Sequence, residues 1–101
     1  MDVIHSQIDK NSKEFKENYA FHQSLREELI QKLEKVRLCG GEKNVLRHHE
    51  RGKFLPRERI FKILDEGSPF LELSSLAAEG VYGTDVPSAG VVTGIGRVHG
   101  I

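Results

Sequence analysis

The chain has 101 residues, and its 15 basic residues balance its 15 acidic ones, so the formal net charge is zero. Zero net charge argues against a protein that binds nucleic acid through overall charge. No uncharged stretch approaches the roughly 20 apolar residues of a membrane helix, so no membrane partner is predicted. The single cysteine cannot form an internal disulfide and favours a reducing compartment. The first twenty residues, with four acids and no arginine, resemble neither a secretory signal nor a mitochondrial transit peptide.

Charge and glycine divide the chain into two parts. Residues 1–66 carry 26 of the 30 charged side chains, whereas residues 67–101 carry four of them and seven of the ten glycines. A charged part with helical periodicity followed by an apolar, glycine-rich part predicts helices first and strands with loops afterwards. The sequence therefore indicates the α/β class.

A long amphipathic helix is predicted first. Asn11 or Ser12 suits its N-cap, and Glu14 stands three residues after Asn11, as in a capping box. Cys39-Gly40-Gly41 is expected to end the helix, because glycine readily adopts the left-handed cap conformation. One stripe of the helix is formed by residues at steps of three and four, namely Phe15, Tyr19, His22, Leu25, Leu29, Leu33 and Val36.

Two shorter helices are expected next. The first is basic and extends from Glu42 to about Arg51. The second contains Pro56 in its first turn, where the missing N–H group costs nothing. Gly67 is its predicted C-cap. Its predicted buried face consists of Ile60, Ile63 and Leu64.

Two strands complete the pattern, at residues 70–73 and 91–98, with an irregular stretch between them. The second is apolar on both faces, which predicts burial inside a sheet. Gly94 and Gly96 within it indicate close approach by another part of the chain. Two short strands with open edges do not make a stable sheet, so this pattern is typical of the beginning of a longer protein.

Four stretches carry a family resemblance. The run RGKFLPRERI at residues 51–60 resembles a segment of the carboxyltransferase subunits of biotin-dependent acyl-CoA carboxylases. The runs DEGSPFLELS at 65–74 and VPSAGVVTGIGRVHG at 86–100 continue the resemblance, and GGEK at 40–43 is similar to the family upstream. The resemblance is tight over residues 40–101 and loose over the preceding helix.

Within that family, the chain looks most like the β subunits that act on 3-methylcrotonyl-CoA. Pro56 favours this branch over the propionyl-CoA branch, and geranyl-CoA carboxylase is the nearest sibling. Phe54 and His99 are mild departures from the family pattern, at positions with no expected catalytic role.

The resemblance implies the N-terminal part of a crotonase-like α/β carboxyltransferase domain. Residues 1–41 are then a helical extension, and residues 42–101 are the start of the domain. The reaction implied is transfer of CO₂ from carboxybiotin to 3-methylcrotonyl-CoA, a step of leucine breakdown. The glycine-rich turns that stabilise the enolates lie further along such subunits, so no catalytic residue is expected in this chain, and the short chain by itself is expected to be inactive.

The resemblance also implies partners and a location. Biotin is carried by an α subunit that also contains the biotin carboxylase, the β subunits form a homo-oligomeric core, and the second substrate is the acyl-CoA. The location implied is the cytoplasm of a bacterium, or the mitochondrial matrix of a eukaryote. An alternative function of another class is a stand-alone helical module that docks on or assembles with a larger protein, without catalysis.

A basic stretch at residues 43–62, with a net charge of +5, is the candidate binding region. Arginine and lysine suit phosphate oxygens, so the stretch is a candidate for binding the phosphates of CoA. The simpler interpretation is that these charges solvate helix faces and pair with Glu50 and Glu58. The candidate phosphate ligands are Arg51, Lys53, Arg57 and Arg59.

Three other patterns do not indicate a site. His48 and His49 are neighbours and point about 100° apart on a helix, so they do not form a metal pair, and no metal site is expected. Gly94-Ile95-Gly96 lacks the third glycine of a dinucleotide-binding loop at the required spacing. Cys39 lacks a recognisable base pattern, so it is not a candidate nucleophile.

Overall fold

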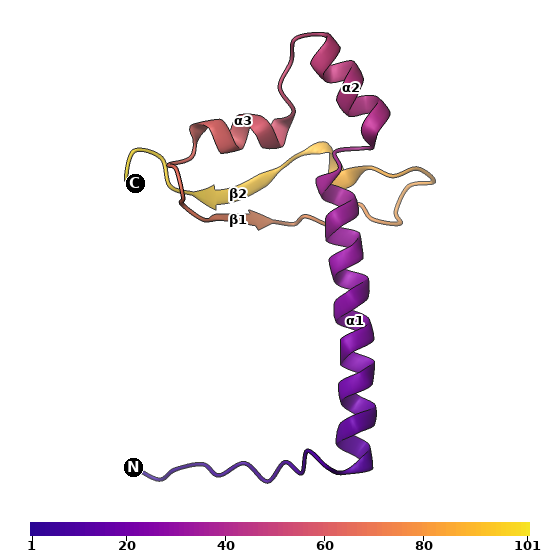
Figure 1. Cartoon of the computed structure of the whole chain (residues 1–101), viewed down its shortest axis with the longest axis vertical. Coiled ribbons are helices and arrows are strands. Elements are labelled where there is room, and N and C mark those ends of the chain that lie inside the picture. Colours follow the sequence, from indigo (N-terminus) through magenta and orange to yellow (C-terminus); the bar gives the residue numbers. More distant parts are fainter. The chain divides into compact units, whose positions relative to one another are not determined.

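The computed structural model describes all residues from 1 to 101, and Figure 1 shows the order of their helices and strands. The chain divides into two compact units, Met1–Gln31 and Lys32–Ile101, which are described separately. The elements in chain order are α1 (Lys13–Arg37), α2 (Glu42–Glu50), α3 (Pro56–Ile63), β1 (Phe70–Leu73), the 3₁₀ segment η1 (Pro87–Gly90) and β2 (Thr93–Gly96). The three predicted helices and the two predicted strands are therefore confirmed as elements.

Helix α1 begins on a serine cap. The backbone N–H of Phe15 donates to Oγ of Ser12 at 3.1 Å, and α1 starts at the next residue, Lys13. Of the two predicted caps, Ser12 is thus correct. The capping box between Asn11 and Glu14 is wrong, because the third residue after the actual cap is Phe15, which has no side-chain acceptor.

Replacing Ser12 by alanine is expected to weaken the first turn of α1 by about 1 kcal/mol, because one backbone donor of that turn loses its acceptor. The measurement is amide hydrogen exchange of Phe15 in the 101-residue chain, which should become faster. Asn11→Ala is the matched control. Only the backbone N–H of Asn11 is bonded, at 2.9 Å to Oδ1 of Asp9, so this substitution should leave the exchange rate of Phe15 unchanged.

The apolar stripe of α1 is helical as predicted, but no residue of the helix is buried. In the first unit, Phe15 and Tyr19 stack with their ring centroids 6.2 Å apart, and Leu25 and Leu29 are exposed. The periodicity therefore predicted the conformation of α1. Leu33 and Val36, the two stripe residues that belong to the second unit, are half-buried.

Helix α3 ends earlier than the sequence suggested. Leu64 is the C-cap, with extended backbone angles, and the next residue, Asp65, donates its N–H to the carbonyl of Arg97 at 2.9 Å. Gly67 was thus wrong as the cap and lies in the following turn with φ of 72°. Ile63 was wrong as a buried residue, since it is 63% exposed, whereas Ile60 and Leu64 are half-buried.

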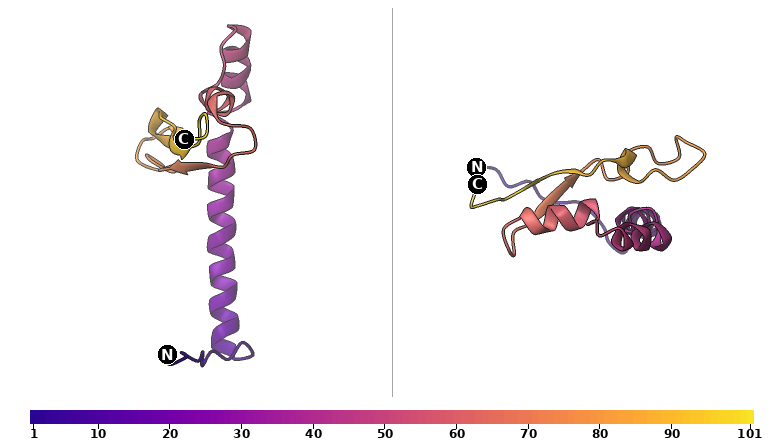
Figure 2. Two further views of the ribbon diagram at one scale, coloured as in Figure 1. Left: turned by 90° about the vertical axis from the view of Figure 1, so that its left-hand side faces the viewer. Right: turned by 90° about the horizontal axis from the view of Figure 1, so that it is seen from above.

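The two strands form an antiparallel pair, and α3 lies beside them in Figures 1 and 2. Phe70 is opposite Gly96, and Leu73 is opposite Thr93. Strand β2 is four residues long, shorter than the predicted eight, and all its residues are exposed. The predicted burial of this strand does not occur within the chain, because β1 is its one partner and nothing covers its outer face.

The predicted close approach at the glycines of β2 is confirmed. A Cβ atom at Gly94 would overlap the ring of Phe70 and would lie 2.6 Å from the carbonyl oxygen of Leu71. A Cβ atom at Gly96 would overlap a methyl group of Leu64. Glycine is therefore needed at both positions so that α3 and the ring of Phe70 can contact the strand.

Packing between the elements is limited. The rings of Phe61 on α3 and Phe70 on β1 meet edge to face, with centroids 6.4 Å apart. No hydrophobic side chain is buried, and the one buried residue is Ser88. None of the helices combines the length and the apolar character that a membrane crossing requires.

Candidate functional site

A cleft of about 510 Å³ in the second unit is the candidate site. Its volume lies in the range of small-molecule sites, roughly 300 to 1,000 Å³. The cleft is lined by residues of four parts of the chain: the end of α1 and the turn after it, α2 and the residue after it, the start of α3, and the segment 87–92. They are Val36, Cys39, Gly40, Asn44, Arg47, His48, Arg51, Leu55, Pro56, Arg57, Pro87, Ser88, Gly90, Val91 and Val92.

One face of α2 supplies the polar wall of the cleft. Its polar residues are Asn44, Arg47 and His48 of α2 and Arg51, the C-cap of the helix. They follow one another at steps of three, one and three, so they lie on the same side. The opposite wall is largely apolar and comes from the start of α3 and from the segment 87–92. The cleft is thus cationic on one side and apolar on the other.

The positive charge of this wall has no counter-charge inside the cleft. No Asp or Glu is among its lining residues. Arg47 and Arg51 form no ion pair in the structure, and both are exposed. In an environment with apolar walls, two unpaired guanidinium groups attract anions, and phosphate oxygens fit their planar donors.

Arg57 also lines the cleft, but its guanidinium group is paired with Glu72 of β1. Nη1 and Nη2 donate to the two carboxylate oxygens at 2.5 and 2.6 Å, and the side chains are only 14% and 16% exposed. This hydrogen bonding raises the pKa of Arg57 and lowers the pKa of Glu72. Nε of Arg57 is buried and has no partner. The pair joins the first turn of α3 to the middle of β1.

The pair makes stability depend on acid pH. The pKa of Glu72 in the folded protein is below its ordinary value of 4.5, so the pair contributes fully above that pH. The contribution is lost as the pH falls from 4.5 through the lowered pKa, where the unfolded chain binds the proton more readily. Thermal unfolding between pH 7 and pH 3 should show this loss. Glu72→Gln should flatten the acid limb of the curve, and an unchanged slope would contradict the assignment.

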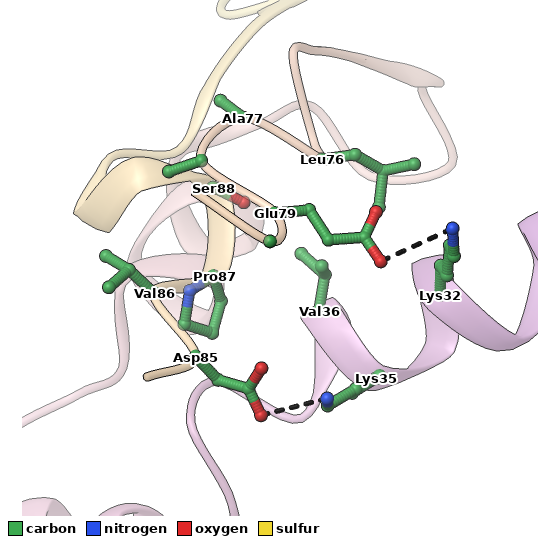
Figure 3. Close-up of a pocket in the computed structure, with 12 residues that line it drawn as sticks. Lys32, Lys35, Val36, Leu76, Ala77, Glu79, Asp85, Val86, Pro87 and Ser88 are labelled. Carbon is green, nitrogen blue, oxygen red and sulfur yellow. Dashed lines mark ion pairs between the residues drawn. The ribbon is translucent and has the colours of Figure 1, made fainter. Parts of the chain in front are cut away.

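A second, smaller cavity shares lining residues with the cleft (Figure 3). The ion pairs around this cavity connect the loop 74–92 to α1. Lys32 and Lys35 of α1 form ion pairs with Glu79 and Asp85, at 3.5 and 2.8 Å. The hydrogen bond from Lys35 to Asp85 raises the pKa of the lysine. These exposed pairs place the loop against the last turns of α1, and the same loop carries the apolar wall of the cleft.

Ser88, the one buried residue of the chain, connects two parts of this loop by a hydrogen bond. Its Oγ donates to the carbonyl of Ser75 at 3.1 Å, and the N–H of Ala89 donates to the carbonyl of Ala77 at 3.0 Å. Ser88 and Ala89 both have positive φ, 52° and 51°, in a sparsely populated region for residues other than glycine. These two bonds connect the segment that contains Ser75 and Ala77 to η1, which contributes to the apolar wall.

The four candidates from sequence occupy different environments. Arg51 lines the cleft without an ion-pair partner, and Arg57 lines it while paired with Glu72. Lys53 and Arg59 are exposed outside the lining of the cleft. Arg47 and His48 belong to the lining but were not among the candidates. Their helical spacing from Asn44 and Arg51 is the signal that could have identified them.

The two neighbouring histidines point to different surroundings. His48 lines the cleft, whereas Nε2 of His49 lies 2.8 Å from Oε1 of Glu58. Glu58 also accepts the backbone N–H of Leu55 at 2.7 Å, and this bond lowers its pKa. No group of three or more His, Cys, Asp or Glu side chains in the chain is arranged for a metal ion.

Comparison with known proteins places the chain in a class. The model of the family described as "Carboxyl transferase domain" matches residues 47–101, more than half of the chain. The chain therefore belongs to the carboxyl transferase domain family. This assignment confirms the resemblance seen in the sequence.

Two curated relatives identify the branch that the chain resembles. It is 46% identical over 100 residues to the mitochondrial methylcrotonoyl-CoA carboxylase beta chain of Dictyostelium discoideum, covering 98% of this chain and 17% of that protein. It is 56% identical over 79 residues to the biotin-dependent 3-methylcrotonyl-coenzyme A carboxylase beta1 subunit of Mycobacterium tuberculosis, covering 78% and 15%. The chain thus spans about a sixth of the length of these relatives.

A solved structure confirms the fold class. The beta subunit of P. aeruginosa geranyl-CoA carboxylase aligns with a TM-score of 0.60 and 32% identity, over 99% of this chain and 18% of that one. The chain therefore has the fold of part of a crotonase-like carboxyltransferase subunit. Its long helix, short helices and first strands are the elements that the sequence indicated.

Proposed function

We propose that the chain acts as part of a carboxyltransferase β subunit that transfers CO₂ from carboxybiotin to 3-methylcrotonyl-CoA. The observation that carries the proposal is the 46% identity to a methylcrotonoyl-CoA carboxylase beta chain over 98% of this chain. The aligned region covers nearly the whole chain and therefore includes the stretches that line the cleft. Acyl-CoA is the substrate class, and biotin is supplied by an α subunit with biotin carboxylase activity.

In this proposal the chain contributes structure and substrate binding rather than the reacting groups. Residues 1–41 form a helical extension, and residues 42–101 begin the carboxyltransferase domain. The basic region, with Arg51 in the cleft and Lys53 and Arg59 beside it, provides positive charge for the phosphates of the acyl-CoA. Arg57 holds α3 to β1 through Glu72 and thereby positions one end of that cleft.

The experiment uses the protein from its source cells. An antibody raised to residues 42–62 precipitates it, and the precipitate is assayed with ATP, labelled bicarbonate and 3-methylcrotonyl-CoA. Incorporation of label that avidin abolishes is the expected result, because avidin sequesters biotin. Absence of avidin-sensitive incorporation with any branched acyl-CoA would overturn the proposal.

Geranyl-CoA is the closest competing substrate, since the solved relative is a geranyl-CoA carboxylase. Both acyl-CoAs are therefore offered to the same precipitate at equal concentration. A larger kcat/KM for 3-methylcrotonyl-CoA supports the proposed branch. A larger kcat/KM for geranyl-CoA keeps the reaction and reassigns the substrate.

A non-catalytic docking module is the second candidate function. The observation in its favour is that no hydrophobic side chain is buried, while large apolar residues such as Phe54, Phe61 and Leu71 are exposed. Such surface is suited to binding another protein. A blot of source-cell lysate with the same antibody separates the two functions: a band at 11.4 kDa that co-purifies with a carboxylase supports docking, and a band several times larger supports the subunit.

A further inference from the structure

We propose that His49 and Glu58 form a pH-sensitive contact that holds α2 against α3 and thereby sets the width of the cleft. One wall of the cleft lies on α2, and part of the opposite wall lies at the start of α3, so the spacing of these two helices decides its width. The inference goes beyond the proposed function and does not depend on which substrate the protein carboxylates.

The contact joins the end of one helix to the beginning of the next. Nε2 of His49, in the last turn of α2, lies 2.8 and 3.1 Å from the two carboxylate oxygens of Glu58, in the first turn of α3. Both helix dipoles favour its charged form, because a helix stabilises a cation at its C-terminal end and an anion at its N-terminal end. The side chains are 43% and 37% exposed, so protons of the solvent reach the pair freely.

The link between the two helices leaves their angle open to change. It consists of residues 51–55 (Figure 1), and Gly52 within it has a positive φ of 67°. The N–H groups of Gly52 and Lys53 donate to the carbonyls of His49 and His48, at 2.8 and 3.1 Å. No hydrogen bond or ion pair connects α2 to β1, β2 or the loop 74–92. The contact with Glu58 is therefore the polar restraint on the position of α2 relative to α3.

The sign of the pH dependence follows from the two groups. Imidazole is the side chain whose charge changes between about pH 5 and 8. The pKa of Glu58 is lowered, chiefly by the N–H of Leu55 and then by His49 and the charge of Lys62, so this carboxylate stays ionised over the same range. The contact is an ion pair at the acid end of the range. At the alkaline end it is a weaker hydrogen bond to a neutral ring.

Other charged groups do not replace either partner. The charged residues nearest to His49 along the chain are Glu50, Arg51 and Lys53, which are exposed and form no ion pair. The acids of the elements after α3 have partners of their own, in the pairs Asp65–Arg97, Glu72–Arg57, Glu79–Lys32 and Asp85–Lys35. Glu58 is thus the one carboxylate in contact with the imidazole of His49.

Glu58 has a second bond that does not involve His49. Its Oε2 accepts the backbone N–H of Leu55 at 2.7 Å, which caps the first turn of α3. This bond remains when the imidazole loses its charge. A rise in pH therefore loosens the contact between the helices and leaves α3 itself folded.

Amide hydrogen exchange measures the contact in the protein purified from its source cells. Protection factors, which exclude the intrinsic pH dependence of exchange, are compared at pH 6 and pH 8 by mass spectrometry. The amides of Gly52 and Lys53 are expected to lose about threefold in protection at pH 8, the size of effect typical of an exposed ion pair. The amide of Leu55 should keep its protection. Constant protection of Gly52 and Lys53 would overturn the proposal.

Three variants assign the effect to the pair. His49→Gln keeps a donor without a titrating charge, so it should hold the link at the wild-type level of pH 8 throughout. Glu58→Gln should also remove the pH dependence, and it should additionally lower the protection of Leu55. His48→Gln is the matched control, because this neighbouring imidazole forms no ion pair, and it should keep the wild-type pH dependence. Loss of the dependence in His48→Gln, or its persistence in His49→Gln, would contradict the assignment.

Alkylation of Cys39 by iodoacetamide reports on the width of the cleft. Cys39 is half-buried, lines the cleft and is the one cysteine of the chain, so mass spectrometry of its peptide gives the rate. The rate in His49→Gln is divided by the wild-type rate at each pH, so that the titration of the thiol cancels. The ratio should be about two at pH 6, where only the wild type has the ion pair, and about one at pH 8. A ratio of one at both values would overturn the control of the cleft. Should the variants fail to fold, the wild-type exchange series still decides whether the contact responds to pH.

Discussion

Replacing Arg57 by alanine is expected to lower the free energy of unfolding by about 3 kcal/mol. The guanidinium group donates two hydrogen bonds to Glu72, and both side chains are mostly buried. Its removal leaves a carboxylate without its partner in a poorly solvated place, which typically costs 3 to 5 kcal/mol. Denaturant unfolding of the protein from its source cells, with wild type and variant side by side, is the measurement.

The matched control is Arg59→Ala. Arg59 is two residues further along α3, is exposed and has no ion pair, so its removal should change stability by less than about 0.5 kcal/mol. The double variant Arg57→Met, Glu72→Leu removes both charges with similar volumes, and it should recover most of the lost stability. A double variant that loses as much as the two single variants together would show that the pair itself is not the cause.

Substituting alanine at Gly94 is expected to lower the free energy of unfolding by about 3 kcal/mol, at the upper end of the overpacking range. The added Cβ would overlap the ring of Phe70 and lie 2.6 Å from the carbonyl oxygen of Leu71. The ring can rotate away, but the carbonyl belongs to the paired strand β1 and cannot move without breaking the pairing. The loss of stability therefore comes from weaker pairing between β1 and β2.

Gly83→Ala is the control for this prediction. Nothing lies within 4 Å of a Cβ atom at Gly83, and its φ is not positive, so the substitution should be neutral or slightly stabilising. Phe70→Leu added to Gly94→Ala should restore only part of the loss, because the carbonyl remains. Thermal unfolding of the four proteins decides the matter, and full rescue by the smaller side chain would show that the carbonyl contact is unimportant.

Local signals in the sequence predicted the elements well. The apolar spacing of α1, the position of Pro56 at the start of α3 and the β1 run each depend on residues within a few positions of one another. These features are decided by backbone preference and short-range packing. The glycines of β2 were also interpreted correctly, because a glycine in an apolar strand indicates close approach.

Apart from the capping box at Asn11 and Glu14, the errors came from contacts between distant residues. Burial of β2 and Ile63 depends on surfaces that this chain does not supply, so hydrophobicity alone overestimated it. The pairing of Arg57 with Glu72 joins residues 15 positions apart, and nothing local distinguishes Arg57 from Arg59. The place of Arg47 in the lining of the cleft depends on which face of α2 meets the segment 87–92, which only the fold decides.

The exposed strand β2 affects how readily newly synthesised chains aggregate. Strand β2 is paired on one side only, and its other edge, with the exposed side chain of Ile95, is one on which another copy of the same segment can pair. Such pairing is bimolecular, so its rate grows with the square of the concentration of uncovered chains, whereas coverage within one molecule does not depend on concentration. Rapid translation on crowded polysomes therefore favours aggregation over assembly. We expect slower synthesis, or a chaperone that shields this edge, to raise the yield of folded protein without changing the stability of the final fold.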